Sequence, residues 1–94
     1  MSMAERIERK LTEALSPARL QIADDSESHK GHGGYREGGE THFRVEIVAE
    51  AFAGQGRVQR QRRVYEILAE ELAERVHALQ LVTLTPEEAA AKQG

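Results

Sequence analysis

The sequence predicts a small α+β domain, with helices packed on one face of a three-stranded sheet in the order α-β-β-α-β-α. Two stretches, residues 19–24 and 41–48, alternate apolar and polar side chains as strands do. A third stretch, residues 57–83, begins with helical spacing of its apolar residues and then changes to strand-like alternation. Ninety-four residues suffice for one hydrophobic core, so we expect a single domain spanning residues 1–94.

The first helix is predicted from the signals at its two ends. Ser2 and Glu5 have the spacing of a capping box, in which each side chain accepts a hydrogen bond from the other residue's backbone N–H. Ser16-Pro17 ends the helix, because a proline disfavours helical geometry in the residue before it. Between these signals runs an apolar stripe made of Ile7, Leu11, Ala14 and Leu15.

The next two elements are predicted to be strands that pair antiparallel. Leu20 and Ile22 point inward from the first strand, and Phe43, Val45 and Ile47 point inward from the second. Between them, residues from about 25 to 40 are rich in glycine and nearly free of apolar side chains. A connection of this length is usually functional or disordered, so we expect a long, flexible hairpin loop.

The second half of the chain is predicted to be helix, strand and helix. Phe52 precedes the long helix and is expected to plug the core. In the following strand Leu79, Leu81 and Thr83 alternate with their neighbours. Thr85 has the position of an N-cap for a short C-terminal helix over about residues 86–91. The predicted buried face of the long helix consists of Val58, Val64, Tyr65, Leu68, Leu72 and Val76.

Composition narrows the possible functions. A net charge of -3 argues against a general nucleic-acid binder, which is usually basic. No apolar run approaches the roughly 20 residues needed to span a bilayer, and the start lacks the apolar core of a signal peptide, so we expect a cytoplasmic protein without a membrane association. The chain has no cysteine and therefore neither a thiol nucleophile nor a thiolate ligand of its own.

The long helix begins with an arginine cluster. Cations at a helix N-terminus oppose the helix dipole, so this layout suggests a use such as docking an acidic partner or a phosphate. The alternative is a solvated helix face, with the pairs Glu71–Arg75 and Arg62–Glu66 reducing the cost. The cluster consists of Arg57, Arg60, Arg62 and Arg63.

Three histidines are candidate metal ligands, since neutral imidazole suits several transition metals. His29 and His32 lie in the glycine-rich loop, where solvated polar residues are the alternative interpretation. His77 lies at the corner between helix and strand, where a partly buried hydrogen-bonding residue is the alternative. His42 projects from a strand and is expected to make a surface or structural hydrogen bond. No nucleophile motif or carboxylate pair is present, so we do not expect an enzyme.

Several short segments spread over most of the chain match one known family. They are Ser26-x-x-His29, Glu40-Thr41-His42-Phe43-Arg44-Val45, Phe52-Ala53-Gly54, Arg60-Gln61-Arg62-Arg63-Val64-Tyr65, Val76-His77-Ala78-Leu79 and Thr85-Pro86-x-Glu88. Through these segments the chain resembles the BolA family over nearly its whole length. The family usually has histidine and serine at two positions where this chain has Gln61 and Ala49.

The resemblance implies a fold related to class II KH domains and partnership with a CGFS-type monothiol glutaredoxin. It implies a two-iron, two-sulfur cluster shared with the glutaredoxin and glutathione and absent from the isolated protein, which we expect to be a monomer or a weak homodimer. By position, His77 matches the family's C-terminal histidine ligand. The loop ligand stays open: His29 matches by its spacing from Ser26, and His32, which we favour, by its spacing from His42.

We therefore expect an adaptor in iron–sulfur and iron homeostasis. The alternative implied by the resemblance is a DNA-binding transcriptional regulator of stress response and cell morphology. In that function the arginine cluster would contact phosphates of duplex DNA, with a strong dependence on salt.

Overall fold

The computed structural model describes residues 2–24, 42–74 and 76–93. The predicted loop, about residues 25–40, lies outside the described residues. In chain order the elements are α1 (Met3–Leu15), β1 (Arg19–Asp24), β2 (His42–Val48), the 3₁₀ turn η2 (Glu50–Phe52), α2 (Arg57–Ile67), α3 (Ala69–Glu74), β3 (Ala78–Leu84) and α4 (Pro86–Gln93).

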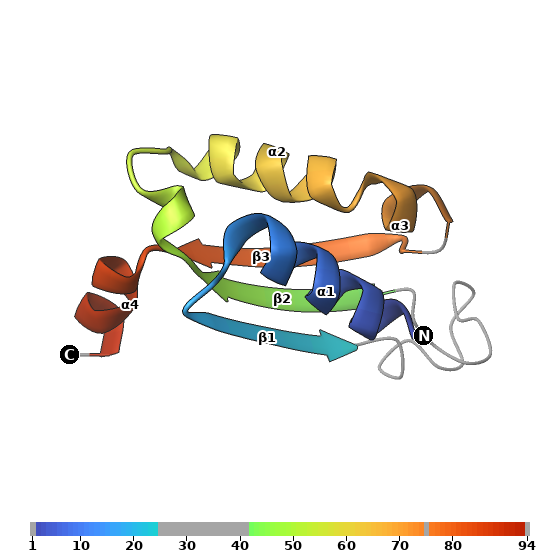
Figure 1. The fold of residues 1–94 in the computed structure, drawn as a ribbon, viewed down its shortest axis with the longest axis horizontal. Helices are drawn as coiled ribbons and strands as arrows, with labels where there is room; N and C mark the ends of the chain where they lie inside the picture. Colours follow the sequence, from blue (N-terminus) through green and yellow to red (C-terminus); the bar gives the residue numbers. More distant parts are fainter. Residues whose placement is uncertain (1, 25–41, 75, 94) are drawn as a thin grey trace.

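Within the described residues the strands form a three-stranded sheet in the order β1-β2-β3 (Figure 1). Strand β1 pairs antiparallel with β2, which confirms the predicted pair. Strand β3 pairs parallel with β2, with His42 opposite Ala78 at one end and Val48 opposite Leu84 at the other. Helices α1, α2 and α3 pack against the sheet, whereas α4 lies beyond the end where β2 and β3 finish (Figure 1).

The core lies between the sheet and the helices. The predicted inward residues of β2 are buried, and Phe52 fills the core as expected, with none of its surface exposed. Leu79 and Leu81 of β3 are partly buried against the same cluster. Ala14, which we expected in the stripe of α1, is exposed. The buried cluster contains Met3, Ile7, Leu11, Leu15, Phe43, Val45, Ile47, Ala49, Phe52, Val64, Leu68 and Val76.

Both predicted helix starts are confirmed by their caps. At α1 the Ser2 hydroxyl accepts a hydrogen bond from the N–H of Glu5 at 3.1 Å, and the Glu5 carboxylate accepts one from the N–H of Ser2 at 3.0 Å. At α4 Thr85 and Glu88 make the same reciprocal pair, at 3.1 and 2.9 Å. Helix α1 ends at Ser16, which has a left-handed backbone with φ of 44°. Helix α4 continues to Gln93, beyond the predicted residue 91.

The long helix differs from its prediction in two ways. It is divided at Leu68 into α2 and α3. Val58 and Tyr65, predicted to be buried, are 64% and 41% exposed, so that part of the prediction was wrong. The inward positions of α2 are Arg60 and Val64, followed by Leu68. Because Val58 precedes Arg60 by two residues, about 200° around a helix, it points to the opposite side.

The described segments contain no helix that is both long enough and apolar enough to cross a membrane.

Candidate functional site

His77 lies at the end of the sheet where β3 begins. It follows α3, its side chain is exposed, and its neighbours Val76 and Ala78 are held by burial in the core and by pairing with His42. At the same end, Asp24 of β1 pairs with Phe43 of β2. Asp24 and His42, the described residues that flank residues 25–41, therefore lie at the end of the sheet where His77 lies. This is the corner at which the resemblance implies a ligand of a shared metal cluster.

The two loop histidines, His29 and His32, lie outside the described residues. His29 follows Asp24 by five residues and His32 precedes His42 by ten. An extended chain covers roughly 3.3–3.6 Å per residue, so neither connection is too short to bring an imidazole to this end of the sheet. Chain connectivity thus leaves both candidates open, and which histidine is the ligand stays a prediction.

The donor set of the described residues can be compared with what an iron–sulfur cluster requires. The described residues contain no group of three or more histidine, cysteine, aspartate or glutamate side chains placed to hold a metal ion. The chain also has no cysteine. Protein iron–sulfur clusters are held mainly by thiolates, and histidine replaces cysteine on one iron in some of them. This chain could therefore contribute imidazole to a cluster whose thiolates come from a partner.

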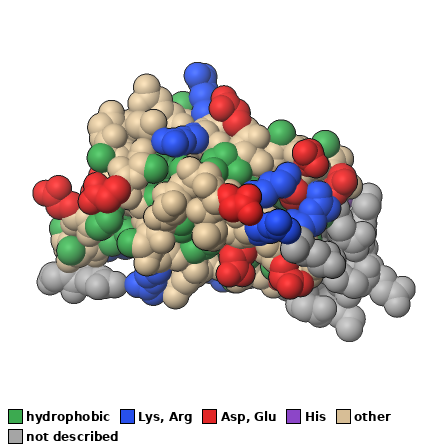
Figure 2. Space-filling model, in the orientation of Figure 1, with side chains coloured by type: hydrophobic (Ala, Val, Ile, Leu, Met, Phe, Trp, Pro, Cys, Tyr) green, Lys and Arg blue, Asp and Glu red, His purple; other side chains and the backbone are tan. Residues whose placement is uncertain are grey.

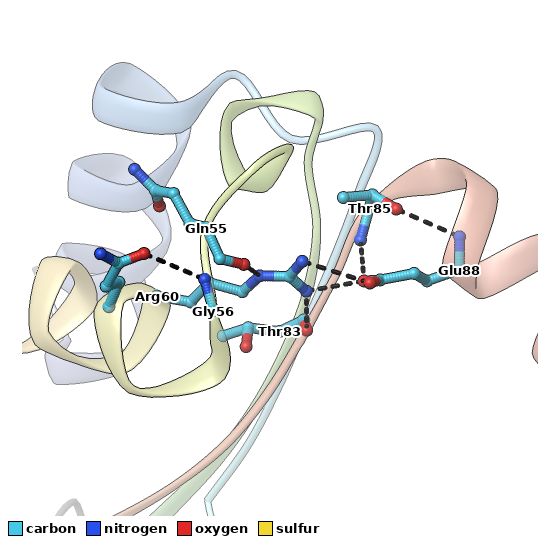
Figure 3. A network of polar contacts seen from close by, with 7 residues as sticks. Gln55, Gly56, Arg60, Thr83, Thr85 and Glu88 are labelled. Atoms are coloured by element: carbon cyan, nitrogen blue, oxygen red, sulfur yellow. Dashed lines mark hydrogen bonds and ion pairs between the residues drawn. The ribbon is translucent and has the colours of Figure 1, made fainter.

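At the other end of the sheet, Arg60 is enclosed rather than free (Figure 3). Its side chain is 11% exposed. Nε donates to the carbonyl of Gln55 at 2.8 Å, and Nη1 donates to the carbonyl of Thr83 at 3.0 Å. Both terminal nitrogens donate to the Glu88 carboxylate, at 2.6 and 3.2 Å. The guanidinium carbon also lies 5.8 Å from the centroid of the Phe52 ring.

The charges of this network stabilise each other. The hydrogen bond from Arg60, and after it the backbone N–H of Thr85, lower the pKa of Glu88 to about 2. The hydrogen bond with Glu88 in turn raises the pKa of Arg60, against the effect of desolvation. Arg60 therefore ties α2 to β3 and α4. Its donors are directed at internal acceptors, which corrects the expectation that it presents an open cation to phosphate.

The other three arginines of the cluster differ in how exposed their side chains are. Arg63 is partly buried and donates from Nη1 to the carbonyl of Ala51 at 3.1 Å. Arg57 and Arg62 are exposed. The four arginines thus do not form one surface, although they lie within seven residues of sequence. Only Arg57 and Arg62 keep the exposure that we expected of the whole cluster.

A buried acid that sequence reasoning missed lies near the His77 end. The Glu71 side chain has no exposed surface and accepts ion pairs from Arg6 at 2.8 Å and Lys10 at 2.9 Å, which fastens α3 to α1. Burial raises its pKa, but the hydrogen bond from Lys10 and the charges of Lys10 and Arg6 bring the pKa below the ordinary value. Acidic and basic side chains gather over this part of the molecule (Figure 2).

The solvated-face interpretation of the long helix named the pairs Glu71–Arg75 and Arg62–Glu66, of which only the second lies wholly within the described residues. Glu71 pairs with α1, and Arg75 lies outside the described residues. Among the residues that the structure describes, no ion pair joins Arg62 to Glu66. The one available signal in the sequence was Arg6 and Lys10, two cations one helical turn apart on α1. Nothing local indicated that their partner would be an acid more than sixty residues away.

Comparison with known proteins agrees with this architecture. The family described as BolA-like protein matches residues 11–88. The chloroplastic protein BOLA1 of Arabidopsis thaliana is 45% identical over 91 residues, which cover 95% of this chain and 57% of that protein, so the chain spans little more than half of this relative. The DNA-binding transcriptional regulator BolA of Escherichia coli K12 is 42% identical over 88 residues, covering 94% of this chain and 80% of that protein.

A solved structure confirms the fold. The BolA domain of SufE1 from Arabidopsis thaliana superimposes with a TM-score of 0.83 at 42% identity, covering 94% of this chain and 96% of that domain. The family match spans most of the chain, from within α1 to the first turn of α4. The chain belongs to the BolA-like family.

Proposed function

We propose that this protein is a cytoplasmic BolA-like adaptor in iron–sulfur and iron homeostasis. It pairs with a CGFS monothiol glutaredoxin and contributes histidine to a two-iron, two-sulfur cluster that bridges the two proteins. The observation that carries the proposal is the exposed His77 at the sheet end where Asp24 and His42 also lie, in a chain without cysteine. The role assigns no catalytic step to this chain.

The local structure suits His77 to this task because its backbone is held while its ring stays open. Val76 is 4% exposed, and its N–H donates to the carbonyl of Glu71 at 3.0 Å. Ala78 is paired with His42 in the sheet. The imidazole thus projects from a rigid corner, which limits the entropy lost when a ligand is bound. The glutaredoxin and glutathione supply the sulfur ligands, and ligation by histidine raises the reduction potential relative to all-thiolate ligation.

The second ligand is His32 or His29. Alanine substitution of each one separately distinguishes them, because only the true ligand changes the spectrum of the shared cluster. We favour His32 for its distance of ten residues from His42.

The deciding experiment is anaerobic cluster reconstitution on a CGFS glutaredoxin with glutathione, with and without this protein. We expect a new absorption and circular dichroism spectrum that saturates at equal stoichiometry and is lost with His77→Ala. His42→Ala is the matched control, since it removes a histidine from the same sheet end and should leave the shared cluster in place. An unchanged spectrum with His77→Ala would show that His77 is not a ligand.

A second candidate function is DNA binding. It is supported by the name of the Escherichia coli relative and by the exposure of Arg57 and Arg62 on α2. In this case the double variant Arg57→Glu, Arg62→Glu should abolish a salt-sensitive gel shift with duplex DNA. Arg19→Glu, an exposed arginine on β1, is the control. Arg60 is unsuitable for this test, because its replacement also disrupts the Glu88 network. A gel shift that survives the double variant would exclude this use of α2.

A further inference from the structure

Among the residues that the structure describes, none provides a hydrogen-bond partner for some backbone groups on the outer edge of β3. The carbonyl of Leu84 accepts the N–H of Ala49 at 2.9 Å, on the β2 side, whereas the carbonyl of Thr83 accepts Arg60 Nη1 at 3.0 Å. Backbone polar groups of a strand alternate in direction, so Thr83, Leu81 and Leu79 present theirs away from β2. Within the described part of the chain, β3 is the last strand on this side, and no hydrogen bond reaches the outward groups of Leu79 or Leu81.

An open cavity of about 650 Å³ lies along this edge. Four consecutive residues of β3, Leu81–Leu84, line it. Because neighbouring side chains of a strand point to opposite faces, a hollow touched by all four follows the strand edge rather than one face of the sheet. We call this cavity the β3-edge groove. Its other walls are the start of α2 and the helix α4, through Gln55, Gly56, Arg57, Arg60, Glu88 and Lys92.

The charge of the β3-edge groove is positive, although the chain as a whole carries -3. Arg60 and Glu88 neutralise each other through their 2.6 Å contact. Arg57 and Lys92 are exposed cations on opposite walls, one on α2 and one on α4. A ligand that lies along the edge is therefore flanked by two positive charges.

We propose that the β3-edge groove binds an extended peptide segment of a partner protein that carries acidic side chains. The segment adds to the sheet as a further strand, with main-chain hydrogen bonds to Leu79 and Leu81 and with its carboxylates near Arg57 and Lys92. The pairing ends before Thr83, because the carbonyl of Thr83 already accepts a hydrogen bond from Arg60. Leu79 lies outside the groove near the start of β3, so the peptide extends from the groove toward the His77 end. None of these contacts uses a histidine, so the proposal does not rest on the shared cluster.

The observations favour an acidic peptide over two other occupants. A second copy of this chain, paired edge to edge, would bring two grooves with the same positive charge together, which is unfavourable. A nucleic acid would place phosphates near Arg57 and Lys92, but phosphates carry no donors for the outward carbonyls of Leu79 and Leu81. A peptide strand supplies both N–H donors and C=O acceptors at the spacing of β3.

The test uses a fluorescein-labelled peptide of about eight residues in which valine and glutamate alternate, long enough to match β3. We expect saturable binding by fluorescence anisotropy. In hydrogen exchange followed by NMR, saturating peptide should slow exchange of the Leu79 and Leu81 amides about tenfold or more. The Gln80 and Val82 amides, which face β2, should be protected already in the free protein. A fully N-methylated version of the peptide keeps every side chain and should not bind.

A variant with reversed charges provides the second part of the binding test. The variant Arg57→Glu, Lys92→Glu should bind the valine–glutamate peptide about tenfold more weakly and a valine–lysine peptide more tightly. Arg19→Glu, an exposed arginine on β1, should change neither affinity.

Four results would each overturn the proposal. One is an absence of binding at about 1 mM peptide, the limit of useful affinity. The others are binding without protection of Leu79 and Leu81, equal binding of the N-methylated peptide, and stronger protection of the same amides by an oligothymidylate of similar length. The last would show that the groove prefers nucleic acid.

Discussion

At the end of the sheet where β3 finishes, the guanidinium of Arg60 is enclosed by two carbonyls and a carboxylate. At the end where β3 begins, the imidazole of His77 is exposed. Both residues looked like candidate binding groups in the sequence. The difference shows that a polar side chain is available to a ligand only where the fold has not already given it partners. Substitutions at the two ends should therefore separate stability from binding.

The largest effect on stability is expected from Arg60→Ala. The carbonyls of Gln55 and Thr83 lose their donor and Glu88 loses its cation, so the free energy of unfolding should fall by about 2–4 kcal/mol. Urea denaturation followed by circular dichroism measures it. Arg60→Lys keeps the charge but loses the planar guanidinium group. Its free energy of unfolding should therefore lie between those of wild type and Arg60→Ala. A loss below about 0.5 kcal/mol would mean that the network is only a surface contact.

Glu71→Ala tests whether a polar residue contributes to stability because it is buried, whichever end of the sheet it lies near. Glu71 lies near the His77 end but is fully buried, so we expect a loss of about 1–3 kcal/mol in the free energy of unfolding. The matched control is Glu70→Ala: its carboxylate is 78% exposed and lies 3.8 Å from Lys10. Equal stabilities of the two variants would contradict the structural role of Glu71.

Acid should reduce the contribution of the Arg60–Glu88 pair to the free energy of unfolding over a defined range of pH. The pKa of Glu88 is about 2 in the folded protein, against an ordinary value of 4.5, so its contribution to stability is complete above pH 4.5. It is lost as the pH falls from 4.5 through 2. Chemical denaturation of wild type and Glu88→Gln across this range should show a difference that is largest above pH 4.5 and shrinks toward pH 2. A difference independent of pH would exclude the carboxylate's charge as its cause.

The smallest effect on stability is expected from His77→Ala. An exposed side chain should change the free energy of unfolding by no more than about 0.5 kcal/mol, measured by the same urea titration. The same variant is the one that should abolish the shared cluster, so it completes the contrast with Arg60→Ala. A large destabilisation would instead assign His77 a structural role.

Much of the fold could be predicted because its signals are local. The alternation of Phe43, Val45 and Ile47 with polar neighbours predicted β2, and its inward face is buried. The capping pairs at α1 and α4 join residues three positions apart, and they form as expected. The position of His77 between helix and strand followed from the change of period at that point.

The candidate site could be predicted less completely. Val58 and Tyr65 were placed in the core by their apolar character, but Arg60 takes the inward position on α2 through its contacts with β3 and α4. The arginines were grouped because they are close in sequence, yet helical geometry points them in different directions. Arg57 and Lys92, which flank the β3-edge groove, are 35 residues apart in the sequence and share no local pattern.

The sequence by itself determined the periodic elements, the helix caps and the chemistry that the chain can offer a metal, since a protein without cysteine can contribute imidazole but no thiolate. Only the tertiary structure decided which charged side chains have ion-pair partners within the fold. Arg60 meets Glu88 across 28 residues, and Arg6 meets Glu71 across 65. The reason is that periodicity and capping depend on neighbours within a few residues, whereas ion pairs between elements depend on how those elements pack.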